Sequence, residues 1–398
     1  MNEKKLLIAI LMLIVIIACF VIYRANITYE MKGCMTYSEL TRLVKKELIT
    51  FKQYEYPNDM IEYLAKYKIV MTGETHYIKE NGLVLTNLMI KLHEKSNFNT
   101  LLIEMPHCFN WVYEDYVAGL LKEVDEKKMF LELHRIDILK DYNLTHESKI
   151  KVHTIDINHQ KLYFTNSLKF MNSILKSKYI EDQLTKYTNH MDNELYLKAL
   201  KTTLLEIKSN QSILTEQLTD NWYNRLYKMI EVEILSHNCR NLIEIGKKEQ
   251  RYYEREEYIK KTVDQYLQNT TKIMLHMGSQ HIKNNSNTFD IEWVGEYLSN
   301  RNLHAKNSTY SIRLCYSKGS NYRGNYNLLK LRLKNNLPVL MAKLIKNKSG
   351  FLPLQNKDFD NNLWFYINKQ PLQVKNYYDG ILMMPVGTYD NTIIENYN

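Results

Sequence analysis

Short, continuous apolar runs alternate along this chain with longer stretches in which apolar residues recur every three or four positions. The runs predict strands, and the continuous run at 100–104 is typical of a strand buried on both faces of a parallel sheet. They lie at 67–72, 100–104, 150–155, 272–277, 310–316, 363–367 and 380–384. The helical spacing occurs at 36–66 (with a break at Pro57), 84–93, 111–133 and 291–298. This alternation predicts an α/β fold, in which helices flank a mainly parallel sheet.

One long stretch departs from the alternation. From about 160 to 267 the helical pattern is almost unbroken, for example at Leu197, Leu200, Leu204 and Ile207. Such stripes are what one buried helix face requires. The stretch therefore predicts a large helical insertion between the third and fourth core strands, where it would form a lid or a wall over a site.

The start of the chain carries a different apolar pattern. The eighteen residues Leu6–Tyr23 contain no charge, Pro or Gly, and this length meets the minimum for crossing a bilayer. They fit an uncleaved signal anchor. A lipoprotein signal is the alternative, because Ile16-Ile17-Ala18-Cys19 resembles a lipobox, but the residues after Cys19 stay apolar. We expect 1–24 to tether one domain, 25–398, to a membrane with its bulk outside the cytoplasm.

Composition narrows the class further. The 398 residues are 45% hydrophobic and 24% charged, which is ordinary globular composition. The net charge of +9 is expected to be spread thinly, and no Lys/Arg block with interleaved aromatics occurs. This pattern predicts no nucleic-acid partner and leaves weak attraction to anionic lipid open. The five cysteines include no Cys-x-x-Cys pair, so neither a disulfide scaffold nor a zinc knuckle is indicated.

The pattern Gly-x-x-His occurs twice, each time where a predicted strand ends. The first is Gly73-Glu74-Thr75-His76 and the second is Gly278-Ser279-Gln280-His281. Sites in open α/β sheets assemble at the carboxyl ends of strands. Two further predicted strands end in carboxylates, Glu104 and Asp156. If these strands are neighbours, one pocket receives two imidazoles and up to three carboxylates.

Such a cluster supports two kinds of chemistry. A carboxylate can orient a neutral histidine that acts as a general base, or the same side chains can ligate a divalent metal. Asp156 has a simpler interpretation as a helix cap, and the spacing around Arg255 indicates a solvated helix face. His276 is expected to be a core histidine. His107, His153 and His159 are expected to be incidental. No Gly-x-Ser-x-Gly elbow, His-Glu-x-x-His helix or phosphate-binding loop is present.

At these residues the chain resembles the erythromycin esterase-like proteins, which are similar to a wider group containing Tiki peptidases, TraB-like and ChaN-like proteins. The shared signature is the two Gly-x-x-His motifs with Glu104 between them, together with Arg255 and the segment 378–385. The resemblance implies that His76 is the base that activates water and that Glu74 is its partner. Glu104, Arg255 and His281 would complete the pocket. Tyr77 stands where the family has a small residue, which would narrow the site.

The leading hypothesis is therefore a membrane-tethered hydrolase of ester or related acyl bonds, acting on a small-molecule substrate without a cofactor. Its candidate catalytic residues are His76, Glu74, Glu104, His281 and Arg255, and its candidate substrate-binding residues are Asp156 and Tyr77. Two alternatives stay open. One is a metal-dependent peptidase of the Tiki type, with a divalent ion in the same pocket. The other is a non-enzymatic protein that binds haem or another ligand.

Overall fold

The computed structural model describes residues 12, 14–17, 30, 35–121, 123–126, 132–189, 193–270, 272–285, 291–321, 323–331, 334–359, 363–365 and 371–390. Most of Leu6–Tyr23, including Cys19, and most of the expected tether at 25–35 lie outside these residues. Among the helices that are described, none combines the length and the apolar character needed to cross a bilayer.

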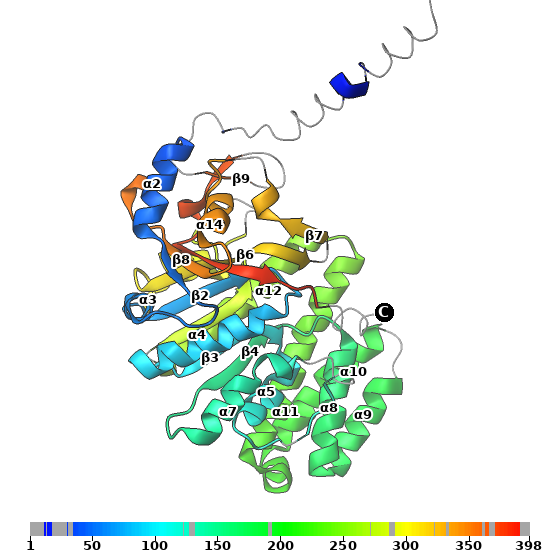
Figure 1. Ribbon diagram of the computed structural model, residues 1–398. Helices are drawn as coiled ribbons and strands as arrows, with labels where there is room; N and C mark the ends of the chain where they lie inside the picture. The colour runs from blue at the N-terminus through cyan, green and yellow to red at the C-terminus, as the bar shows by residue number, and fades with distance from the viewer. Residues whose placement is uncertain are drawn as a thin grey trace, which may run out of the picture.

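In the described part of the chain, nine strands form one twisted sheet in the order β1-β8-β11-β6-β2-β5-β3-β4, with β7 paired to β6 (Figure 1). Six neighbours, from β11 to β4, run parallel, and β8 and β7 pair antiparallel with β11 and β6. The strands are β1 (Ile49–Phe51), β2 (Ile69–Glu74), β3 (Thr100–Pro106), β4 (Lys151–Asp156), β5 (Ile273–Gly278), β6 (Thr309–Asn321), β7 (Gly324–Asn327), β8 (Ser349–Pro353) and β11 (Gly380–Gly387). A separate pair consists of β9 (Leu363–Phe365) and β10 (Pro371–Gln373).

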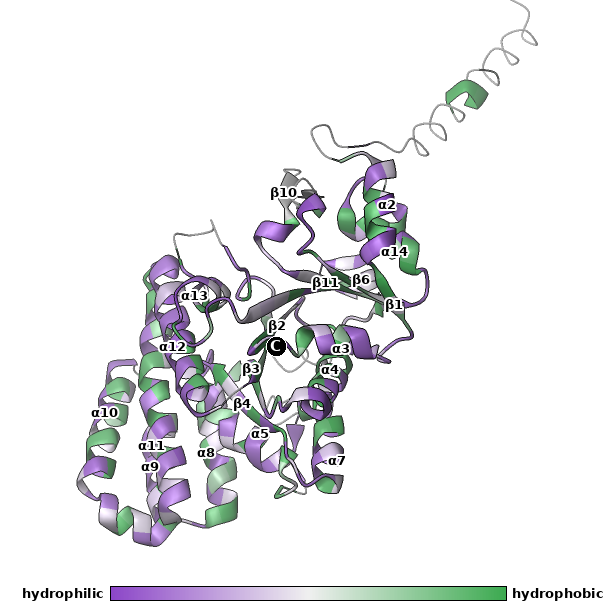
Figure 2. Cartoon of the chain, turned by 90° about the vertical axis from the view of Figure 1, so that its left-hand side faces the viewer, coloured by the Kyte–Doolittle hydropathy of each residue, from purple (hydrophilic) through white to green (hydrophobic). Residues whose placement is uncertain are grey.

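Helices cover both faces of the sheet (Figure 2). One apolar core contains Val70 and Leu101, and a second contains their chain neighbours Met71 and Leu102. Successive side chains of a strand point to opposite faces, so a strand with a core on each side needs a continuous apolar run. The helices are α2 (Tyr37–Glu47), α3 (Asn58–Leu64), α4 (Glu80–Ser96), α5 (Asn110–Val117), α7 (Asp137–Thr145), α8 (Lys161–Leu175), α9 (Lys178–Asn189), α10 (Asn193–Ser209), α11 (Gln211–Glu244), α12 (Lys248–Asn269), α13 (Val294–Asn300) and α14 (Leu337–Ile345).

The predicted fold class is confirmed: a mostly parallel sheet flanked by helices, with a large helical region, α8 to α12, between β4 and β5. This region forms the lower part of the molecule in Figure 1. Its last helix, α12, packs against β4 and returns the chain to the centre of the sheet. The insertion therefore delivers side chains to the same strand ends that carry the sequence motifs.

Several predicted boundaries are wrong. The helix expected over 111–133 stops at Val117, because Gly119 adopts a φ of +75°, and a 3₁₀ turn, η2 (Leu133–Arg135), and α7 follow. The helical stretch expected over 36–66 contains the edge strand β1 between α2 and α3. A capping box between Thr36 and Glu39 starts α2.

Candidate functional site

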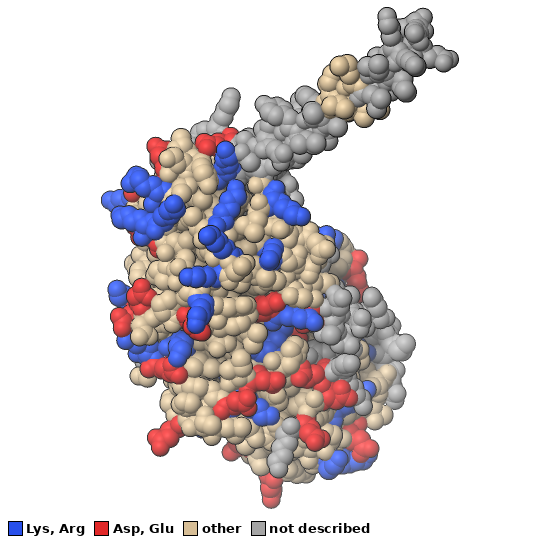
Figure 3. All heavy atoms as spheres, in the orientation of Figure 1, with Lys and Arg blue, Asp and Glu red and all other residues tan. Residues whose placement is uncertain are grey.

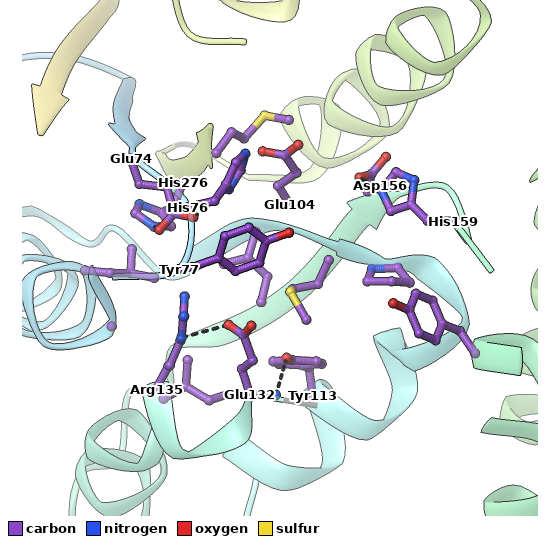
Figure 4. A pocket seen from close by; sticks show the side chains of 18 of the residues that line it. Glu74, His76, Tyr77, Glu104, Tyr113, Glu132, Arg135, Asp156, His159 and His276 are labelled. Carbon is purple, nitrogen blue, oxygen red and sulfur yellow. Dashed lines mark hydrogen bonds and ion pairs between the residues drawn. The ribbon is translucent and has the colours of Figure 1, made fainter. Parts of the chain in front are cut away.

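Four neighbouring strands end at one cavity. In the order β2-β5-β3-β4, their carboxyl ends carry Glu74, His276, Glu104 and Asp156. All four side chains line a cavity of about 310 Å³ (Figure 4). His76, Tyr77 and Arg255 line it too. The structure therefore brings six of the seven sequence-predicted residues to the cavity wall, and the seventh, His281, lies behind Glu104.

The two Gly-x-x-His motifs interlock. Glu74 and Gly278 are paired in the parallel register of β2 and β5, and the Ser279 amide donates to the Glu74 carbonyl at 3.0 Å. A Cβ at Gly278 would lie 2.7 Å from His76 Nε2 and 3.3 Å from Glu104 Oε2. A Cβ at Gly73 would lie 2.8 Å from the Ser279 Cα. Because each glycine lacks a Cβ, atoms of the other motif can pack directly against its backbone.

Glu74 holds two imidazoles. His76 Nδ1 lies 2.9 Å from Oε1, His276 Nε2 lies 2.9 Å from Oε2, and the Thr72 hydroxyl lies 2.8 Å from His276 Nδ1. Burial raises the pKa of Glu74, but the hydrogen bonds from both histidines outweigh burial and hold it well below its usual range. The His76 side chain is half exposed at the cavity mouth. Burial lowers the pKa of His76, but the Glu74 hydrogen bond and the Glu104 charge raise it overall, to about 9.

Arg255 of α12 joins the other two carboxylates. Its Nε and Nη2 donate to Asp156 at 2.7 and 2.6 Å, and Nη2 also donates to Glu104 Oε1. Glu104 Oε2 accepts from the Gly278 amide at 2.6 Å, and Asp156 Oδ2 lies 2.7 Å from His159 Nε2. Burial raises the pKa of both carboxyls, but the charges of His281 and Arg255 at Glu104, and of Arg255 and His159 at Asp156, outweigh burial and hold both pKa values well below their usual range. The expected solvated helix face is wrong at Arg255, which is buried.

His281 is buried and supports Glu104 from behind. Its Nε2 lies 3.2 Å from Glu104 Oε1, and its Nδ1 lies 2.6 Å from Oε1 of Glu256, the residue after Arg255 on α12. Burial lowers the pKa of His281, but Glu256 and Glu104 raise it overall, to about 10. A protonated His281 keeps Glu104 ionised.

Tyr77 projects across the cavity between these groups and a second wall (Figure 4). Its φ of +63° is one that a bulky residue rarely adopts. Glu132 and Arg135 form the second wall, with Arg135 Nε 2.7 Å from Glu132 Oε2. Burial raises the pKa of Glu132.

Four cavity residues with charged or imidazole side chains are not among the site residues predicted from sequence. His276 and His159 were expected to be a core and an incidental histidine, yet both line the cavity. The signal for His276 was its position two residues before Gly278, on the same side of β5. Glu132 and Arg135 had no signal, because they belong to an irregular segment whose sequence resembles a helix.

The donor set does not fit a divalent metal. Arg255 donates to both Glu104 and Asp156, so a guanidinium already occupies the place between the two carboxylates. Both Glu74 oxygens face imidazole nitrogens. A cation placed here would meet the Arg255 charge at close range. Among the described residues, no group of three His, Cys, Asp or Glu side chains has an arrangement that could hold a metal ion.

No family model matches this chain, and no curated protein does. Among solved structures it is similar to a protein from Bacillus cereus, with a TM-score of 0.66 and 13% identity, over 89% of this chain and 98% of that one. It is also similar to a succinoglycan biosynthesis protein, with a TM-score of 0.61 and 14% identity, over 89% and 98%. A third similar structure is a histidine mutant of erythromycin esterase EreC in its open conformation. Its TM-score is 0.59 and its identity is 13%, over 87% of this chain and 99% of that one. At these identities the similarity shows a shared fold alone.

Proposed function

We propose that this protein hydrolyses an ester or a related acyl bond and that His76 is the base that activates water. One observation carries the proposal: a carboxylate-bound imidazole stands at the mouth of a cavity, beside a second ionised carboxylate. The fold shared with an erythromycin esterase supports this class of reaction. The role of each residue follows from its hydrogen bonds.

Glu74 fixes the tautomer of the base. The His76 Nδ1–H donates to Glu74, so the lone pair of the neutral ring is on Nε2. Nε2 and Glu104 Oε2 lie near the same point beside Gly278, 2.7 and 3.3 Å from where a Cβ would stand. A water in the cavity that bridges these two atoms donates one hydrogen to each acceptor. His76 takes a proton as the water oxygen attacks the acyl carbon, and then gives that proton to the leaving alkoxide.

The raised pKa of His76 limits this base at neutral pH. With a pKa of about 9, roughly one molecule in a hundred has the neutral imidazole at pH 7. The rate of a reaction that needs the neutral ring therefore rises with pH until the ring has lost its proton. An alkaline optimum distinguishes this base from an ordinary histidine.

The cavity favours a small substrate. Its volume of about 310 Å³ is at the low end of the range for ligand pockets, and Tyr77 takes part of the width. On the second wall, Arg135 Nη2 is buried and has no hydrogen-bond partner among the described residues, although Asp390 Oδ2 lies 4.0 Å away. A buried guanidinium donor is satisfied by a carboxylate or another strong acceptor on the ligand. We therefore expect a small ester that carries such a group, rather than a macrolide.

Steady-state hydrolysis of a panel of short esters and lactones tests the proposal. His76→Ala is expected to lower kcat/KM at least 1,000-fold, since removing a catalytic base costs roughly this much. His304→Ala changes an exposed histidine and is the matched control, with activity expected within twofold of the parent. A chelator is expected to leave the rate unchanged, because no step uses a metal.

Thermal unfolding of both variants confirms that they are folded. Full turnover by folded His76→Ala would contradict the proposed base. Loss of activity to the chelator, restored by a divalent ion, would favour the peptidase alternative instead.

A further inference from the structure

The net positive charge of this protein comes from the last quarter of its sequence. Residues 301–398 contain 14 Lys and Arg against five Asp and Glu, whereas residues 1–300 contain 39 of each. The whole net charge of +9 is therefore in the last 98 residues. The expectation that this charge is spread thinly is wrong.

Most of the described residues in this stretch belong to one end of the molecule. They supply β6, β7, α14, β8 and β11, and α14 packs against α2 and against the 3₁₀ turn η3 (Leu328–Lys330). Figure 3 shows Lys and Arg gathered over this end, whereas Asp and Glu are mixed with Lys and Arg over the rest of the face in view. We call this surface the basic end, and its exposed cations are Arg42, Lys45, Lys46, Lys318, Arg323, Lys330, Lys346, Lys348 and Lys357.

The lysines of the basic end are largely uncompensated. Lys46 has an ion-pair partner, Glu47, at 3.4 Å. Lys330, Lys346 and Lys348 have no carboxylate within 4.0 Å in the described part of the chain, and all three are exposed. Ammonium groups that point into water without a partner produce an attractive field for polyanions and are costly to cluster.

The basic end also contains α2, the first described helix after the apolar segment that ends at Tyr23. Thirteen residues separate Tyr23, the end of the apolar run, from Tyr37, the first residue of α2. A chain of that length spans at most about 45 Å. Charge and tether therefore coincide on the same end, while the cavity is at the strand ends of the other half of the sheet.

We infer that the basic end is a docking surface for an anionic lipid bilayer. Clustered Lys and Arg next to a membrane segment bind the headgroups of acidic lipids, and the attraction is lost within a Debye length of the surface. Docking by this end turns the helical insertion away from the bilayer. The proposal depends on charge and topology and is independent of the reaction at the cavity.

Co-sedimentation of the full chain with vesicles tests the inference. Vesicles of phosphatidylcholine with phosphatidylglycerol are compared with vesicles of phosphatidylcholine alone, so that insertion of the apolar segment contributes equally to both. We expect at least tenfold tighter binding to the anionic vesicles at 0.1 M salt, and little preference at 1 M.

Charge reversal localises the effect. Lys346→Glu with Lys348→Glu is expected to reduce the preference for anionic vesicles about tenfold or more. Lys198→Glu with Lys201→Glu on α10 changes the net charge equally at the opposite end and is expected to keep the preference. Equal binding to both vesicle types, or equal loss in both double variants, would overturn the inference. So would tight binding of duplex DNA without any vesicle preference.

Discussion

At the scale of single residues, Arg135 determines what the second wall of the cavity can bind. The side chain reaches the cavity past Gly82, where a Cβ would lie 2.7 Å from the Arg135 Cβ. Glu132 engages Nε, while Nη2 is buried without a hydrogen-bond partner among the described residues and lies 4.0 Å from Asp390 Oδ2. A buried donor without a hydrogen bond carries a desolvation penalty in the free protein, and a ligand acceptor that binds it removes that penalty. Substrate selectivity is therefore expected to depend on Arg135.

Arg135→Met is expected to raise KM about 10- to 100-fold for an ester that carries a carboxylate, because one charge-assisted hydrogen bond is lost. For an uncharged ester of equal size, KM is expected to change less than threefold. Steady-state kinetics with the two esters measures the difference. Equal loss for both esters would show that Arg135 supports the fold rather than the substrate.

At the scale of elements, the ends of β2 and β5 work as one unit. Gly73 and Gly278 have the same place in the two motifs, but the atoms packed against the two glycines differ. The neighbour of Gly278 is the end of the movable His76 ring, whereas the neighbours of Gly73 include the Ser279 Cα. The same substitution is therefore expected to fail in two different ways.

Gly278→Ala is expected to displace His76 and lower kcat/KM at least 100-fold, because a shift of about 1 Å at a catalytic group has an effect of this size. Gly73→Ala is expected to lower the free energy of unfolding by about 1–3 kcal/mol, as overpacking does when the backbone must move. Denaturant unfolding and ester hydrolysis of each variant separate the two effects. Similar stability losses and similar rates in both variants would contradict an interlocking of the two motifs.

The elements that could be predicted from sequence are those buried on both sides. The apolar runs of β2, β3, β4 and β5 are continuous because each strand contacts a core on each face. The short edge strand β1 and the antiparallel β8 carry no such run and were missed. Strand order could not be predicted either, because β5 reaches its place between β2 and β3 only through contacts distant in sequence.

At the scale of the whole molecule, strand order turns separate motifs into a site. The strand-end residues Glu74, Glu104 and Asp156 could be proposed from sequence, because parallel strands present their carboxyl ends at one edge. Glu132 could not, because an irregular segment places it opposite them. The net charge of residues 301–398 can be counted from sequence, but its meaning depends on most of the described residues in that stretch belonging to one end.

The central claim is that a Glu74-bound His76 is the base, and the pH dependence of kcat/KM tests it most directly. The raised pKa means that the active, neutral ring is lost as the pH falls through about 9. Below that pH, kcat/KM is predicted to rise about tenfold per pH unit. In Glu74→Gln, the loss of the carboxylate is predicted to move this rise of kcat/KM to lower pH. It is also predicted to reduce the maximal kcat/KM at high pH about 100-fold or more. If kcat/KM instead rises around the pKa of an ordinary histidine, or if Glu74→Gln does not move the rise, then a Glu74-bound His76 is not the base.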